Sequence, residues 1–152
     1  MRRIVLAVLT LALLGIPGIA GASLDSFLNN VNVQARVDLP GFSAKVSAQF
    51  GVPVPQVEAV LATVATPADA FMVFQLGQMA HRPPETVMQT YQTHKGKGWG
   101  VIAKELGIKP GSPGFHALKR GDFTFTGEPS GANSNTGTGK GKAKGKDKGQ
   151  PG

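Results

Sequence analysis

Prolines restrict what this chain can fold into, because they recur at the start of most apolar stretches after residue 50. Pro55, Pro67, Pro84 and Pro113 each precede a stretch whose apolar residues have helical spacing. Proline lacks an N–H group and breaks a helix interior, but the first helical turn tolerates it. The sequence therefore predicts a mainly α fold, a compact domain of short helices that begin at prolines.

The stretch that follows Thr66 has the strongest helix signals. Thr66 can cap the helix, Pro67 can occupy its first position, and Asp69 places a negative charge in the first turn, where the helix dipole favours it. The apolar residues between positions 70 and 79 cover more than one face. A helix that is apolar on several faces is buried among others, so we expect this to be the central helix.

Two further helices are predicted between residues 99 and 121. Residues 99–106 have an apolar stripe at helical spacing, and Gly107 can adopt the left-handed conformation that commonly ends a helix. A last helix is predicted to begin at Ser112 and to end at Gly121, with Phe115 facing inward.

The first residues after position 23 fit two structures. Val31, Val33, Ala35 and Val37 alternate with polar residues, which favours a strand, whereas apolar spacing before and after them favours two short helices. Residues 122–126 also alternate and favour an extended strand. Because one strand needs a partner, the sequence leaves open a small two-stranded β element that joins the N- and C-terminal ends of the domain.

The N-terminus has the three parts of a secretory signal peptide. Arg2 and Arg3 form a positive start, residues 4–16 are apolar, and the small residues before Ser23 fit a cleavage site after Ala22. The alternative is an uncleaved membrane anchor, but the apolar run is shorter than the roughly 20 residues that span a bilayer. We expect residues 1–22 to be removed, which leaves an exported protein, periplasmic or secreted, without a stable transmembrane segment.

The chain contains no cysteine. Disulfides, thiolate metal sites, covalent haem attachment and a cysteine nucleophile are therefore excluded, as is the lipid-modified cysteine of a lipoprotein. An exported domain of this size must then be held together by its apolar core alone.

The composition changes at Gly127, and residues 127–152 contain no aromatic residue and no aliphatic residue larger than alanine. Such a segment cannot bury enough apolar surface to fold, so we predict a helical domain over residues 23–126 and a disordered basic tail over residues 127–152. Five basic and two acidic residues give the tail a net charge of +3, whereas nine basic and seven acidic residues give the domain +2. Polyanion binding is therefore expected mainly from the tail, through Lys140, Lys142, Lys144, Lys146 and Lys148.

The loop of Lys95 and Lys97, which alternate with Gly96 and Gly98, is a second candidate for polyanion binding. Glycines leave backbone N–H groups accessible, and the helix predicted from Trp99 would present its positive end beside the two lysines. The alternative is an ordinary connection between helices with solvated lysines.

No pattern in the sequence predicts catalysis, a metal or a cofactor. The histidines His81, His94 and His116 lack the spacing that places two ring nitrogens on one helix face. The carboxylates are scattered singly, and the motifs of serine hydrolases are absent. We predict no catalytic residue, metal site or cofactor, although an enzyme stays open as the less favoured alternative.

Residues 99–108 are similar to the first helix and turn of a helix-turn-helix motif, with residues 115–120 as the recognition helix. The connection between them is longer than the usual 3–4 residue turn, and export would separate the protein from the chromosome. Nucleic-acid binding is therefore the least favoured of the functions considered.

Three segments of the chain, residues 50–55, 67–71 and 98–112, resemble an uncharacterised group of small exported bacterial helical proteins that end in Gly/Lys-rich tails. The similarity covers roughly residues 38–127. The resemblance implies export and a single helical domain, and it implies no activity, cofactor or catalytic residue.

Together these features predict an exported, noncatalytic interaction protein whose basic tail contacts an anionic envelope polymer, a lipid surface or an acidic protein. One alternative is a tail that only keeps the protein soluble. The other is a small cell-envelope enzyme whose site has no recognisable motif.

Overall fold

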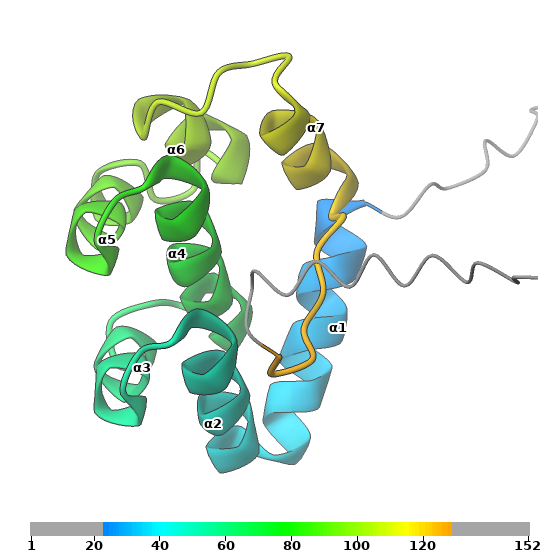
Figure 1. Cartoon of the computed structure of the whole chain (residues 1–152), viewed down its shortest axis with the longest axis vertical. Helices are drawn as coiled ribbons and strands as arrows, with labels where there is room; N and C mark the ends of the chain where they lie inside the picture. The colour runs from blue at the N-terminus through cyan, green and yellow to red at the C-terminus, as the bar shows by residue number, and fades with distance from the viewer. Residues whose placement is uncertain (1–22, 129–152) are drawn as a thin grey trace, which may run out of the picture.

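The computed structural model describes residues 23–128, which form seven α-helices and contain no β-strand (Figure 1). The helices are α1 (Leu24–Val37), α2 (Leu39–Phe50), α3 (Val54–Leu61), α4 (Pro67–Ala80), α5 (Pro84–Thr93), α6 (Trp99–Glu105) and α7 (Pro113–Arg120). The predicted mainly α fold of short helices is therefore confirmed. The predicted signal peptide and nearly all of the predicted tail lie outside the described residues. Within the described part, no helix combines the length and apolar character needed to cross a membrane.

Prolines and polar caps begin the helices as the sequence indicates. Helices α2, α3, α4, α5 and α7 each have a proline at one of their first two positions. At the start of α4, the Thr66 hydroxyl accepts from the Asp69 N–H at 3.2 Å, and the Asp69 carboxylate accepts from the Thr66 N–H at 3.1 Å. At the start of α7, the Ser112 hydroxyl accepts from the Phe115 N–H. The reciprocal pair at α4 and the single bond at α7 satisfy N–H groups that a helix start otherwise leaves unpaired.

Glycines in the left-handed conformation end α6 and α7, which confirms the predictions for Gly107 and Gly121. Gly121, with a φ of 64°, also allows a close approach between the end of α7 and the start of α1. A Cβ atom at this position would lie 2.7 Å from the Ser23 carbonyl oxygen and 2.8 Å from the Leu24 Cα. Only glycine fits between the two backbones without displacing one of them.

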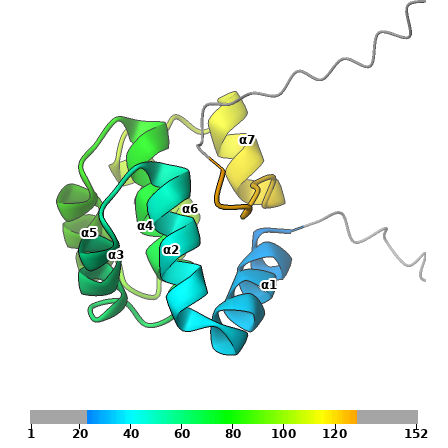
Figure 2. The same cartoon turned by 60° about the horizontal axis from the view of Figure 1, so that its bottom comes forward.

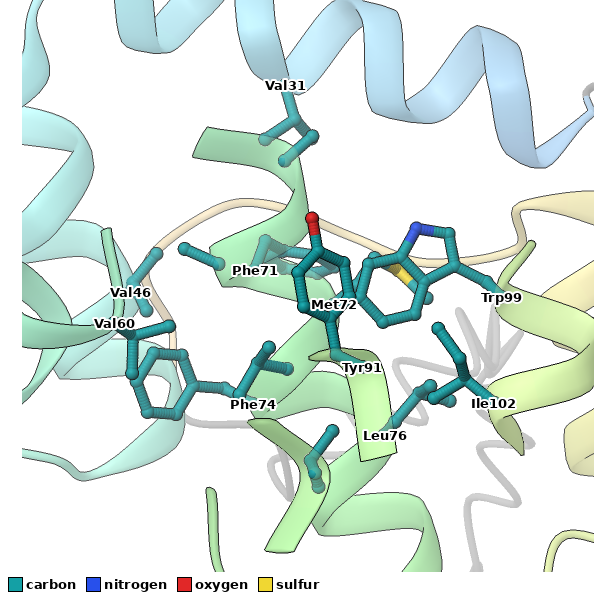
Figure 3. Packing of buried hydrophobic residues seen from close by; sticks show 14 of the residues in the cluster. Val31, Val46, Val60, Phe71, Met72, Phe74, Leu76, Tyr91, Trp99 and Ile102 are labelled. Atoms are coloured by element: carbon teal, nitrogen blue, oxygen red, sulfur yellow. The ribbon is translucent and has the colours of Figure 1, made fainter. Parts of the chain in front are cut away.

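Helix α4 is the central helix, as its apolar residues predict. It contacts α1, α2, α3 and α5, and Figure 3 shows its side chains surrounded by those of other helices. Phe71, Met72, Val73 and Leu76 are completely buried. Complete burial of this many large side chains is the main source of stability in a domain without disulfides.

Helix α1 shows that the strand interpretation of residues 31–37 is wrong and that the helix alternative is correct. Val31 and Ala35, four residues apart, are both 1% exposed, whereas Val33 is 51% and Val37 is 84% exposed. The alternating valines therefore do not share a buried face. Burial follows the helical period, because it also places Phe27 and Leu28 against the core.

Residues 122–128, here called the C-terminal strap, have an irregular course after α7. They pair with no strand, so the β element that the sequence left open is absent from residues 23–128. Phe123 packs against Phe27 with ring centroids 5.8 Å apart, and Phe125 packs against Phe71 at 5.7 Å. The alternating pattern of the strap thus reflects aromatic side chains that anchor it to the helices.

A buried glutamine on α2 supplies the polar contacts of the strap. Gln49 is 4% exposed, and its Nε2 donates to the Thr124 carbonyl oxygen at 2.8 Å. Its Oε1 accepts from the backbone N–H groups of Thr126 at 3.3 Å and Gly127 at 3.4 Å. One side-chain amide therefore satisfies three backbone groups that a neighbouring strand would otherwise have to pair.

Candidate functional site

A groove between α3 and α5 holds about 360 Å³, and Figure 2 shows the two helices side by side. Its lining includes the apolar side chains of Ala59, Val60 and Met88. Gln56 and Glu85 also line it, and the Gln56 Nε2 donates to the Glu85 carboxylate at 3.2 Å. The groove is thus mainly apolar, with one polar bridge between its two helices.

Three further grooves hold about 290, 230 and 460 Å³. The first lies beside Phe50 and Phe74 and includes Arg82, and the second is next to the start of α2. The third lies between the end of α4 and the α6–α7 loop, where Lys109 contributes to the lining. Each of these four grooves therefore has at most one lysine or arginine in its lining.

Tyr91 and Asp69 form a partly buried polar cluster with ionisable groups. The Tyr91 hydroxyl donates to the Asp69 carboxylate at 3.2 Å and accepts from the Ala65 N–H at 3.3 Å. The Tyr91 ring stacks on Trp99, with centroids 5.3 Å apart. This cluster joins α5 to the capped start of α4 and to the α3–α4 loop, so its geometry has a structural role.

Burial raises the pKa of Tyr91 above its ordinary value of 10.0. The Ala65 N–H opposes this by stabilising the phenolate, whereas the nearby Asp69 charge adds to the increase. The folded protein thus holds the Tyr91 proton more tightly than the unfolded chain does. Stability from this group is complete below pH 10 and decreases as the pH rises above that value.

Titration of Tyr91 can be measured directly, because it is the only tyrosine in the chain. We expect the phenolate absorbance of the folded protein to appear at higher pH than that of the protein in urea. The Tyr91→Phe variant should lose this absorbance change, and its thermal stability should decline less steeply above pH 10 than that of the original protein. A native midpoint at or below the denatured one would contradict the structure.

The three histidines lie at different places in the fold, two of them at helix ends. His81 ends α4 in a left-handed conformation with a φ of 52°. His94 ends α5 and bonds through Nδ1 to the Thr90 carbonyl oxygen at 3.1 Å, and His116 is exposed on α7. Within residues 23–128, no three His, Asp or Glu side chains lie close enough to share a metal ion.

Lys95 and Lys97, the predicted anion-binding pair, are exposed in the turn between α5 and α6. The Lys97 N–H donates to the His94 carbonyl oxygen at 3.0 Å, and the flanking Gly96 and Gly98 both have positive φ values. This geometry is that of a tight connection between helices. The other predicted binding residues lie outside the described residues: Lys140, Lys142, Lys144, Lys146 and Lys148.

The segment that is similar to a helix-turn-helix motif has a different connection. Helix α6 ends at Glu105 and α7 begins at Pro113, so residues 106–112 separate them. A 3–4 residue turn is usual in that motif, and the longer connection was apparent from the sequence.

The two parts of the described domain differ in charge, which the net charge of the whole domain conceals. Residues 23–93 contain three basic and five acidic residues, whereas residues 94–122 contain six basic and two acidic residues. We call residues 94–122 the basic end, because α6, α7 and the loops next to them carry a net charge of +4. Counting charges separately in each part of the sequence would have found it.

Comparison with known proteins adds no relative. No protein-family model, curated protein or solved structure matches this chain.

Proposed function

We propose that this protein is an exported, noncatalytic interaction protein. Its basic C-terminal segment binds an anionic surface of the cell envelope and holds the protein there. The observation that carries the proposal is the anchored C-terminal strap. Three backbone groups of the strap bond to the buried Gln49, and Phe125 packs against the core. The chain is therefore held to the folded domain up to Gly127, directly before the segment that contains the five lysines.

The position and charge of the lysines support binding beyond the strap. Twelve residues lead from Glu128 to Lys140, a length of chain that can span at most about 40 Å. Five lysines then alternate with small residues and one aspartate over residues 140–148. A lysine close to an anionic lipid surface contributes about 1 kcal/mol of binding free energy.

The polar groups of the described domain support the noncatalytic part of the proposal, because they stabilise the fold. Asp69 caps α4 and accepts from Tyr91, and Gln49 holds the strap. No side-chain nitrogen or oxygen that is buried within residues 23–128 lacks a hydrogen-bond partner. These groups are already used in structural contacts.

The start of the domain supports export with cleavage after Ala22. Ser23 is the N-cap of α1, and its hydroxyl accepts from the Ser26 N–H at 3.3 Å. A chain that begins at Ser23 would therefore keep the first cap of the domain. The apolar residues 4–16 precede this point and have the length of a signal-peptide core.

Cell fractionation tests both parts of the proposal. After expression of the full chain in a bacterial host, we expect the protein in the envelope fraction, beginning at Ser23 by mass spectrometry. High salt should release it, because salt screens exposed charges. Replacing Lys140, Lys142, Lys144, Lys146 and Lys148 with glutamine should weaken envelope binding by more than about 1,000-fold, because each lysine contributes about 1 kcal/mol.

Substituting the same five lysines with arginine is the matched control, because arginine keeps the charge. Envelope binding should then stay within about twofold of the original protein. Equal binding of the glutamine variant would overturn the tethering proposal, and recovery of the protein in the cytoplasm with residues 1–22 attached would overturn export.

A further inference from the structure

We infer that the basic end of the folded domain is a second contact with the anionic surface, and that this surface is a lipid bilayer rich in anionic phosphate headgroups. This inference rests on the proposed function, which supplies the anionic surface. It adds what that surface consists of and how the domain is oriented on it. The cations of the basic end are Lys95, Lys97, Lys104, Lys109, Lys119 and Arg120, and all are exposed.

Five of these six cations are free to contact a partner. Arg120 and Asp122 form the one ion pair of the described domain, at 3.6 Å, and their side chains are 63% and 70% exposed. No ion pair within residues 23–128 involves the five lysines of the basic end. Their ammonium groups are therefore solvated, and contact with an anionic surface would break no internal pair.

The helices of the basic end direct apolar side chains inward and cations outward. Ile102 and Ala103 of α6 are buried while Lys104 next to them is exposed. In α7, Leu118 is buried while Lys119 is exposed. Figure 1 shows α6 and α7 at the same end of the domain, with their connecting loop over that end. Lys104, Lys109 and Lys119 belong to these two helices and their connecting loop, and all three are exposed.

The distribution of the lysines fits a broad surface better than a single polymer strand. A polymer track would gather cations along a groove, but each of the four grooves described above has at most one lysine or arginine in its lining. Single-stranded nucleic acid also needs exposed rings on which bases stack. Trp99 is only 8% and Tyr91 only 6% exposed, and the two rings stack on each other.

The charge difference between the two parts of the domain sets an orientation. Residues 23–93 have a net charge of −2 and residues 94–122 have +4. A negative surface attracts the basic end and repels the remainder. The domain should therefore bind with α6 and α7 toward the lipid headgroups and with α2 and α3 away from them.

Vesicle binding by paired variants tests this inference. The probe is phosphatidylcholine vesicles with roughly one third phosphatidylglycerol. The protein is the form recovered from the host, with both the folded domain and residues 127–152. Lys104→Gln with Lys109→Gln should weaken binding about 30-fold. Arg36→Gln with Arg82→Gln, which removes two exposed charges elsewhere, should change it less than about twofold. Unaltered far-ultraviolet circular dichroism and melting temperature would show that both variants fold.

The outcomes distinguish a role of the basic end from a role of the lysines in the tail. Equal loss in both double variants, or no loss in Lys104→Gln with Lys109→Gln, overturns a role for the basic end. If Lys104→Gln with Lys109→Gln weakens vesicle binding while the variant with five glutamines in the tail binds fully, the basic end is a contact with the lipid and the tail is not. The lipid assignment is overturned if vesicle binding does not depend on the phosphatidylglycerol content. It is also overturned if the lysine substitutions weaken binding to soluble polyphosphate but not to vesicles.

A second readout measures orientation, and the absence of native cysteine makes it direct. Pro110→Cys places one thiol in the α6–α7 loop, and Ala62→Cys places one at the end of α3; both positions are exposed. With a fluorescent label, the first should be quenched severalfold more strongly than the second by a nitroxide on the lipid headgroup. Equal quenching at the two positions would overturn the orientation.

Discussion

Replacing Phe71 with alanine is expected to lower the free energy of unfolding by about 4 kcal/mol, within the range for large aromatic residues in protein cores. Phe71 lies in the first half of α4 and is completely buried. Its ring lies 5.2 Å from that of Phe27, 5.4 Å from that of Phe50 and 5.7 Å from that of Phe125. The substitution would therefore remove contacts with α1, α2 and the strap together and would leave a cavity among them.

Urea unfolding followed by Trp99 fluorescence measures this loss, since Trp99 is the only tryptophan and is largely buried. Val37→Ala is the control, because Val37 is 84% exposed and its truncation should cost less than about 0.5 kcal/mol. A domain of this size is usually stable by only about 5–15 kcal/mol, so Phe71→Ala should also lower the melting temperature markedly. A loss below about 1 kcal/mol would show that Phe71 is not at the centre of the core.

Replacing Gly121 with alanine is expected to cost about 3 kcal/mol, for two separate reasons. The left-handed conformation of Gly121 costs roughly 1–2 kcal/mol when an L-residue such as alanine replaces the glycine. The new Cβ would also lie within 3 Å of the backbone of Ser23 and Leu24. Because all three atoms within this distance belong to the main chain, α1 and α7 would have to move apart, which adds about 1–2 kcal/mol.

Gly51→Ala separates the two reasons. Gly51 ends α2 with nearly the same φ, 66°, but a Cβ there would have no heavy atom within 4 Å. Its substitution should cost only about 1 kcal/mol, which is the conformational part alone. Urea unfolding of the two variants under identical conditions gives the difference, and equal losses would mean that α1 and α7 do not approach each other as described.

The starts of several helices could be predicted because their signals are local. The capping box of Thr66 and Asp69, the proline that follows Thr66 and the cap at Ser112 act within one turn, so no knowledge of distant contacts is needed. The central position of α4 was also predictable, because apolar residues on several faces require neighbours on several sides.

Residues 31–37 were ambiguous because their valines satisfy two periods at once. A spacing of two residues and a spacing of four both connect Val31 with Ala35. The choice depends on what packs against them, and here Asn32 adds a contact that pattern analysis cannot provide. Its Oδ1 accepts from the Ala68 N–H at 2.8 Å, which joins α1 to the first turn of α4.

The partner of the strap could not be predicted without the fold, whereas the basic end could have been found from the sequence by counting charges in each part of the domain. Gln49 is separated from Thr124 by 75 residues, and a polar residue on a helix gives no local sign that it will be buried. The basic end was hidden because the charges were summed over residues 23–126, where the acidic residues of α1 to α5 cancel much of the positive charge.

The attachment of the strap determines how a mechanical load would enter the molecule. A pull on the chain beyond Glu128 would reach the bonds from Gly127 and Thr126 to Gln49 before it reached any helix. All three strap bonds end on one side-chain amide of α2, so they would break in order from Gly127 toward Thr124. Detachment of residues 122–128 would then expose Phe123 and Phe125 while the contacts of α4 with α1, α2, α3 and α5 stayed in place. The strap would thus detach before the helical core unfolds when the chain beyond Glu128 is pulled.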